Sequence, residues 1–174
     1  MTAGDVPFVE KRNFMSDYRV GIGYDLHRTK AGRHLILANV KIEHTLGLEG
    51  HSDADVVLHA LIDAITGAAG LPDVGQMFPN TDPKYKNIDS AELLRGAMAE
   101  LAKTPWRINN VDLVIVAQAP KIAPYKLAMI RRLSELLGVS MECINIKGKT
   151  KESVDAVGQG HAIACQCAVL LRRD

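Results

Sequence analysis

Two histidines and two aspartates lie within ten residues of this chain, between Gly50 and His59. The apolar residues that begin at Val56 recur with a period near 3.6, which predicts a buried helix from about Asp53. Ser52 or Asp53 is the expected N-cap, because either side chain can accept the first free backbone N–H groups. Charged and imidazole side chains on an otherwise apolar helix indicate a functional site rather than a solvated surface.

On this predicted helix Asp55, His59 and Asp63 are spaced four residues apart, so they share one face. His51 and Ser52 come just before the helix. Free N–H groups and the positive end of the helix dipole favour an anion at that position. The segment therefore offers polar side chains on one helix face and a candidate anion site at the helix start.

A second element supplies polar groups for the same site. Residues 19–24 are predicted to form a strand that ends in Asp25 and His27, which are two apart and so point to one side. With His59 they make a set of two histidines and one aspartate. Three protein ligands that leave one position open are typical of a catalytic zinc site. A lone histidine is more often a partly buried polar group, so the prediction depends on the combination.

The composition is that of an ordinary globular chain. It has 174 residues, 47% of them hydrophobic, which favours one domain with a substantial core. The formal net charge of +1 argues against a nucleic-acid binder that depends on bulk charge, and no apolar run is long enough to span a bilayer. Three cysteines are too few to indicate a disulfide framework. Cys165 and Cys167 are predicted to face the core from one side of a strand.

The element order predicts a single α+β domain over residues 19–174, a mixed sheet with three main helices packed on one face. Residues 1–18 are expected to be a flexible N-terminal extension. Residues 1–17 lack the pattern of a secretory signal, so a cytoplasmic location is expected. Gly21 and Gly23 leave one face of the first strand bare, which predicts a close backbone approach. Strands are predicted at 19–24, 34–38, 40–42, 107–117, 143–147 and 162–172, and helices at about 53–67, 89–103 and 124–138.

Two loops carry groups suited to a substrate. The long loop 71–83 is rich in proline, glycine and aspartate, and long loops in compact domains are often functional. Its Asp73 and Asp82 either accept hydrogen bonds from a sugar or help to hold a metal, or they only form turns. Lys121, in the loop after the strand 107–117, either meets a phosphate or is a solvated lysine.

Residues 148–153 place a glycine, two lysines, two hydroxyls and a carboxylate together. Lysine and threonine suit a phosphate, and Glu152 suits a hard cation. The segment is not a P-loop, because the required spacing is absent. The whole inventory indicates chemistry on a polyphosphate, and a nucleophile that belongs to the substrate would explain why no nucleophilic triad is evident.

Five segments resemble, in chain order, motifs of the 2-C-methyl-D-erythritol 2,4-cyclodiphosphate synthase family. They are Asp25-Leu26-His27, His51 to His59, Asp73-Val74-Gly75, Phe78 to Asp82 and Ala117 to Lys121. The resemblance extends from Arg19 to about Arg172. It implies a homotrimeric lyase of the non-mevalonate isoprenoid pathway, with sites between subunits and no nucleic-acid or membrane partner. The enzyme would convert 4-diphosphocytidyl-2-C-methyl-D-erythritol 2-phosphate into the cyclic diphosphate with release of CMP.

The resemblance also implies roles for individual residues. Asp25, His27 and His59 would bind one zinc ion per subunit, and Glu152 would hold a second cation, magnesium or manganese. His51 and Thr150 match the positions that stabilise the transition state. The implied substrate contacts, to erythritol, phosphate or cytidine diphosphate, are Asp25, His27, His51, Ser52, Asp73, Gly75, Phe78, Asp82, Ala117, Pro120, Lys121, Ile122, Ala123, Lys149, Thr150, Lys151 and Glu152.

The sequence departs from the family pattern near its C-terminal end. Lys149 interrupts a run that is usually rich in threonine, and Ala156, Gln159 and His161 replace a phenylalanine, an arginine and a glutamate. These changes put ligand binding in the family's central channel in doubt, but they leave the zinc ligands unchanged. Two alternatives stay open, a zinc phosphohydrolase that uses metal-bound water and a metal-bound module that holds a nucleotide or terpenoid diphosphate without turnover.

Overall fold

A computed structural model describes residues 16–174, and residues 1–15 of the predicted extension lie outside that range. Five strands form one sheet in the order β4-β1-β7-β5-β6, and a separate hairpin pairs β2 with β3. Only β5 and β6 run parallel within the large sheet, so the sheet is mixed, as the sequence predicts. The strands are β1 (Tyr18–Ala31), β2 (Leu35–Leu37), β3 (Val40–Ile42), β4 (Leu46–Leu48), β5 (Trp106–Val116), β6 (Ile144–Lys149) and β7 (Ala162–Arg173).

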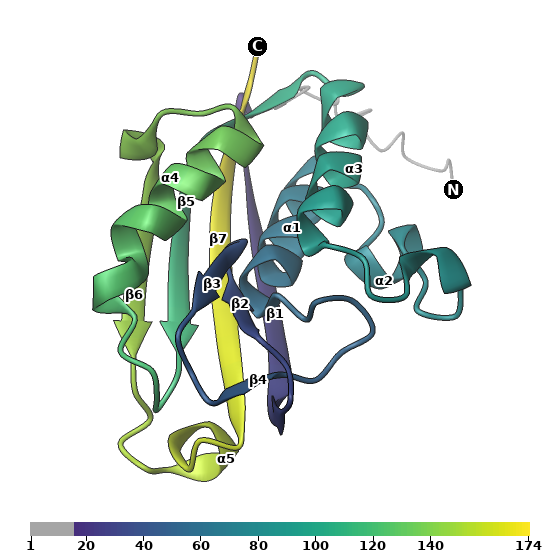
Figure 1. The fold of residues 1–174 in the computed structure, drawn as a ribbon. Coiled ribbons are helices and arrows are strands. Elements are labelled where there is room, and N and C mark those ends of the chain that lie inside the picture. Colours follow the sequence, from purple (N-terminus) through teal and green to yellow (C-terminus); the bar gives the residue numbers. More distant parts are fainter. Residues whose placement is uncertain (1–15) are drawn as a thin grey trace, which may run out of the picture.

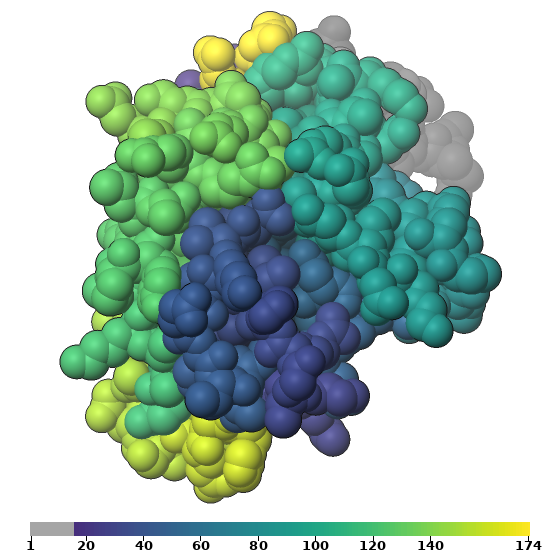
Figure 2. Space-filling view, in the orientation of Figure 1, coloured from purple at the N-terminus to yellow at the C-terminus, as the bar shows by residue number. Residues whose placement is uncertain are grey.

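Three long helices lie on the same side of the sheet, which confirms the α+β prediction (Figure 1). In the space-filling view from that side, the blue side chains of the hairpin region fill the surface between α4 and α3 (Figure 2). Within residues 16–174 no helix combines the length and the apolar character needed to cross a membrane. The helices are α1 (Val56–Ala69), α2 (Val74–Met77), α3 (Ser90–Ala102), α4 (Lys126–Leu137) and α5 (Asp155–Gly158), with short 3-10 turns at Pro83–Tyr85, Ala123–Tyr125 and Met141–Cys143.

The backbone of α1 lies directly on the inner face of β1. A Cβ atom added to Gly23 would overlap the carbonyl oxygen of Ala60, and one added to Gly21 would overlap that of Ala64. Any larger residue would hold the helix away from the strand. The predicted close approach at the two glycines is therefore confirmed, and it brings the α1 side chains next to those of β1.

The start of α1 differs from the prediction. Its N-cap is Asp55, whose carboxylate accepts the backbone N–H groups of Val57 and Leu58. Asp55 is completely buried, and the same carboxylate accepts the N–H groups of Ala38 (3.0 Å) and Asn39 (2.6 Å) in the β2–β3 turn. Burial raises the pKa of Asp55 to about 6, although these four N–H donors favour its ionised form. A tertiary contact with the hairpin thus selects Asp55 over Ser52 and Asp53.

The hairpin turn and the first strand also refine the predictions. Ala38 and Asn39 both have positive φ angles, 54° and 56°, as a two-residue type I′ turn requires. The sequence predicts a first strand that ends in the Asp25 and His27 pair, but β1 continues to Ala31 because it pairs with β7 and then with β4. The three-residue β4 was not predicted. Asp25 and His27 consequently lie inside a long paired strand and not at its end.

We predict that Gly23→Ala strongly destabilises the protein, because the added methyl group forces α1 away from β1. Overpacking of this kind costs about 1–3 kcal/mol, and sometimes more. Gly67→Ala is the matched control. Gly67 lies in α1, and nothing lies within 4 Å of a Cβ atom built there. The control should raise the free energy of unfolding by about 0.5–1 kcal/mol. Urea unfolding followed by circular dichroism measures both, and equal effects would contradict the proposed contact.

Candidate metal centre and adjoining pockets

Asp25 and His27 on β1 and His59 on α1 converge on one point. The Asp25 Oδ2 atom lies 2.9 Å from His27 Nε2 and 2.9 Å from His59 Nδ1, and the two nitrogens are 3.1 Å apart. These are the only three donors among the described residues whose ligand atoms cluster closely enough to hold a metal ion. The structure thus brings together the three side chains that the sequence singles out.

The opposite nitrogen of each imidazole contacts the protein. His27 Nδ1 lies 2.6 Å from the carbonyl oxygen of Glu49, which fixes it as the protonated nitrogen of the neutral ring. His59 Nε2 lies 3.0 Å from the Ser90 hydroxyl and 3.2 Å from the Ser52 hydroxyl. A ligating histidine usually donates its other N–H to such a partner. The donor set of one carboxylate and two oriented imidazoles therefore fits a divalent metal ion.

The pKa values of Asp25 and His27 are both shifted by their contacts in this cluster. Burial alone would raise the pKa of Asp25, but hydrogen bonds and positive charge from His27 and His59 outweigh burial, and this pKa lies well below its ordinary range. Burial alone would lower the pKa of His27, but the hydrogen bond and charge of Asp25 outweigh it, so this pKa is raised. Asp25 is therefore ionised, and its charge favours the protonated form of His27.

A cavity of about 430 Å³ adjoins the candidate metal centre. His51, the predicted transition-state residue, lies on its wall and is exposed, whereas Ser52 is buried. Gly75 and Phe78, implied substrate contacts in the loop 71–83, also line it, and the ring of Phe78 meets Tyr85 edge-on. The cavity wall comprises His27, Gly50, His51, Ser52, His59, Val74, Gly75, Phe78, Asn80, Tyr85 and Leu93.

Asp73 and Asp82 do not line this cavity, and both act as helix caps. Asp73 accepts the backbone N–H of Gln76 at 2.8 Å, and Asp82 accepts that of Lys84 at 3.0 Å. These are the turn-forming roles that the sequence left open as the alternative.

Asp63, on the helix face predicted to carry the site, accepts the N–H of Val74 at 2.8 Å and so ties the loop to α1.

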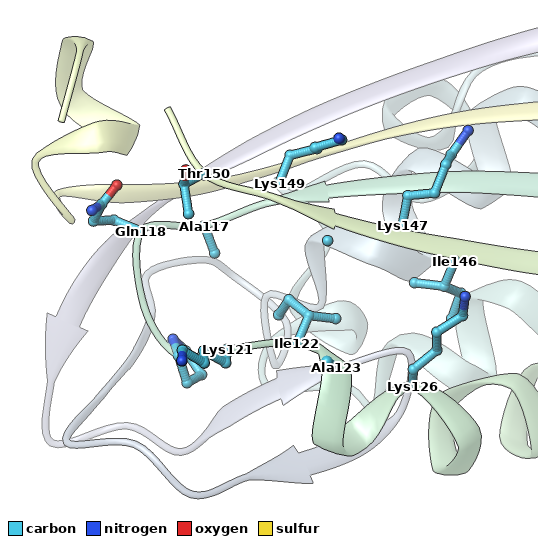
Figure 3. Close-up of a pocket in the computed structure, with 12 residues that line it drawn as sticks. Ala117, Gln118, Lys121, Ile122, Ala123, Lys126, Ile146, Lys147, Lys149 and Thr150 are labelled. Atoms are coloured by element: carbon cyan, nitrogen blue, oxygen red, sulfur yellow. The ribbon is translucent and has the colours of Figure 1, made fainter. Parts of the chain in front are cut away.

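A second cavity of about 500 Å³ lies between the end of β6 and the loop after β5 (Figure 3). It is lined by several of the implied substrate contacts, among them Lys121, Ile122 and Thr150. A Cβ atom added to Gly148 would lie 3.0 Å from that of Ile122, so the glycine keeps this wall open. Figure 3 shows Lys149 extending from the opposite side of β6, away from Ile122. The other lining residues are Ala117, Gln118, Pro120, Ala123, Lys126, Ile146, Lys147, Gly148 and Lys149.

Glu152 lines neither cavity and is not part of the cluster of the three candidate metal ligands. Its backbone has a φ angle of 49°, in the left-handed region, and its carboxylate accepts the Thr150 hydroxyl at 2.5 Å. Lys151 instead pairs with Asp155 at 3.3 Å. The two cavities share no lining residue, so the predicted site residues fall into two separate groups within one chain.

The prediction of an open anion site at the start of α1 was wrong. The N–H groups of Val57 and Leu58 are already occupied by Asp55, so they are not available to a ligand there. Sequence reasoning also missed Ser90 as a neighbour of the candidate ligands. Ser90 lies at the start of the helix predicted at about 89–103, and its position in the sequence indicates only a helix start.

We predict a pH-dependent stabilisation by the Asp25–His27 pair in chelator-treated protein. The lowered pKa of Asp25 gives stability that is present above its unfolded value and lost as pH falls. The raised pKa of His27 gives stability that is present below its ordinary value of 6.5 and lost as pH rises through the folded value. Asp25→Asn should therefore cost more unfolding free energy near about pH 5.5 than near about pH 8.5. Urea titrations at both values measure this, and a larger cost at the higher pH would contradict it.

Comparisons with known proteins agree with this geometry. A model described as the YgbB family matches residues 18–172. A protein of Dechloromonas aromatica (strain RCB), named 2-C-methyl-D-erythritol 2,4-cyclodiphosphate synthase, is 50% identical over 157 residues, which are 90% of this chain and 98% of that protein.

Solved structures resemble the fold over the same range. The bifunctional IspDF of Campylobacter jejuni aligns with a TM-score of 0.87 and 38% identity over 90% of this chain, which spans only 42% of that longer protein. An IspF of Plasmodium falciparum, solved as a CDP complex, aligns with a TM-score of 0.80 and 35% identity, over 90% of this chain and 97% of that one.

Proposed function

This chain belongs to the YgbB family, and from that membership we propose that it is a 2-C-methyl-D-erythritol 2,4-cyclodiphosphate synthase. The reaction is a cyclisation in non-mevalonate isoprenoid biosynthesis. The 2-phosphate of 4-diphosphocytidyl-2-C-methyl-D-erythritol 2-phosphate attacks the β-phosphorus, a new P–O bond closes the ring, and the P–O bond to CMP breaks. The nucleophile belongs to the substrate, which agrees with the lack of a nucleophilic triad among the predicted site residues.

The convergence of Asp25, His27 and His59 beside a cavity carries this proposal. These residues would hold a zinc ion, which when bound would polarise a phosphate oxygen and neutralise part of its charge. The cavity wall between α2 and α1 would hold the methylerythritol unit with its two phosphates close together. Such positioning makes the step effectively unimolecular, and effective concentration is a large source of rate.

His51 and Thr150 would stabilise charge that develops on the phosphate oxygens. His51 projects from the wall of the cavity next to the candidate ligands, and Thr150 lies in the second cavity, where Lys121 and Ile122 would hold the cytidine diphosphate. Glu152 would hold magnesium or manganese together with phosphate oxygens. Among the described residues Glu152 belongs to no group of three or more such donors, so that second cation would need the substrate as a ligand.

The separation of the two cavities supports a homotrimer with sites between subunits. One substrate must contact both groups of residues, and within one chain the groups share no wall.

The outer face of β1 supplies a surface for assembly, because its apolar side chains point away from α1 and are 42–69% exposed. Contiguous exposed apolar side chains usually mark an interface. They are Tyr18, Val20, Ile22, Tyr24 and Leu26. Cytoplasmic location remains part of the same proposal.

We predict that zinc-loaded protein releases CMP from the diphosphocytidyl substrate in equal amount to a cyclic diphosphate seen by phosphorus NMR. Chelator treatment should abolish the release, and added zinc should restore it. His51→Ala should lower kcat by about 10²–10³-fold while zinc content stays unchanged. Arg95→Ala is the control, since Arg95 is exposed on α3, pairs with Glu92 and lines neither cavity. A simple hydrolysis product would instead identify a phosphohydrolase, and binding without turnover would identify a non-enzymatic module.

A second prediction tests assembly. Ile22→Asp places a charge in the middle of the exposed β1 face, so it should convert a trimer into monomers and abolish turnover. Light scattering after gel filtration measures the mass, and zinc titration checks that Asp25, His27 and His59 still bind metal within the single chain. A monomeric wild-type protein with full activity would contradict the proposal of sites between subunits.

A further inference from the structure

Ser90 is completely buried and contacts two functional groups at once. Its hydroxyl oxygen lies 2.5 Å from Asp53 Oδ1 and 3.0 Å from His59 Nε2. Ser90 is the first residue of α3, but the helix is capped by Asp89, whose carboxylate accepts the N–H of Ala91. The Ser90 hydroxyl is therefore not needed to cap its own helix, and its burial needs another explanation.

The hydrogen atoms at this contact can be assigned by counting donors and acceptors. Asp53 accepts from the Ser90 hydroxyl, from the Ser90 backbone N–H at 3.2 Å and from the Asp55 N–H at 3.2 Å. This is the acceptor-only behaviour of a carboxylate. The single Ser90 hydroxyl hydrogen thus points at Asp53, and the Ser90 oxygen can only accept, from His59 or from the Ser52 hydroxyl at 3.3 Å. When the Ser52 hydroxyl donates to Ser90, both oxygens beside His59 Nε2 present lone pairs to it, and this arrangement favours the ring hydrogen on Nε2.

This assignment leaves the His59 Nδ1 lone pair directed at Asp25 and His27, where the candidate metal site lies. We propose that Asp53 and Ser90 form a positioning pair, which fixes the tautomer and the ring orientation of His59 so that Nδ1 binds the metal. Because Ser90 donates its hydroxyl hydrogen to the Asp53 carboxylate, the Ser90 oxygen becomes a better acceptor for the His59 ring N–H. This role rests on the proposed zinc site and assigns it two residues outside the ligand set.

Ser52 contacts the same ring nitrogen at 3.2 Å but is arranged differently. Its oxygen already accepts the N–H of Ala54 at 3.0 Å and lies 3.3 Å from the Ser90 hydroxyl, and within the described residues it has no carboxylate partner. Ser52 therefore does not dictate which ring nitrogen carries the hydrogen. The comparison of Ser52→Ala with Ser90→Ala separates tautomer control from simple loss of a hydroxyl neighbour.

The first measurement is zinc affinity by competition with a chromophoric chelator. Ser90→Ala should weaken zinc binding about 10–100-fold, as loss of a ligand's outer partner generally does. Ser52→Ala should weaken it much less. Asp89→Ala is the matched control for damage to α3, since it removes the helix cap and the contact with Asn39 without touching His59. That variant should lose thermal stability and keep wild-type zinc affinity.

The second measurement reads the tautomer directly in metal-free protein. Long-range ¹⁵N–¹H correlations of labelled histidines distinguish a hydrogen on Nε2 from one on Nδ1. The Asp25 carboxylate competes for a hydrogen on His59 Nδ1, so the measured quantity is the share of the Nε2–H form, which Ser90→Ala should lower relative to the wild type. An unchanged tautomer together with zinc affinity within about threefold of wild type would overturn the proposal.

The two measurements also separate this proposal from the proposed function. If wild-type protein binds no zinc, the metal site fails, yet the NMR spectrum of the metal-free chain still tests the tautomer. If zinc binds and Ser90→Ala weakens it without any change of tautomer, the pair only packs against the ring and the positioning role is wrong.

Discussion

The direct contact between the α1 backbone and two glycines of β1 is the constraint on which the candidate site depends. Helix and strand run in opposite directions, with Ala64 over Gly21 and Ala60 over Gly23. The next residue on the same face of β1 is Asp25, which meets His59 one helical position from Ala60. The ligand distances are thus fixed by backbone packing, and a rigid scaffold of this kind holds a metal site within a narrow geometry.

The candidate ligands were predictable because their spacing has a direct geometric meaning. Asp25 and His27 are two apart on a strand, and His59 lies in a strongly periodic apolar helix, so each side chain's direction follows from local structure. The start of that helix was not predictable. Ser52, Asp53 and Asp55 are all competent caps, and the choice is made by the distant turn at Ala38 and Asn39, which also binds the Asp55 carboxylate.

Contacts between distant parts of the chain also explain the other features that the sequence did not reveal. The extension of β1 to Ala31 depends on pairing with β4, and a three-residue strand such as Leu46–Leu48 has too little periodicity to stand out. Ser90 gave a helix-start signal and no sign of its contact with His59, because that contact joins residues 31 positions apart. Side chains alternate between the two faces of β6, so the direction of Lys149 follows from this alternation. Only the bounds of the strand reveal which face carries Lys149.

The exposed apolar face of β1 has a consequence for how the folded state is maintained. A single chain presents the row from Tyr18 to Leu26 to water, although the opposite face of the same strand is covered by α1. If this row is covered only in an assembly, association and folding become one coupled equilibrium, and dilution alone weakens the fold by mass action. Newly synthesised chains would then expose this apolar row until they associate, so the rate of association would limit how much assembled protein accumulates.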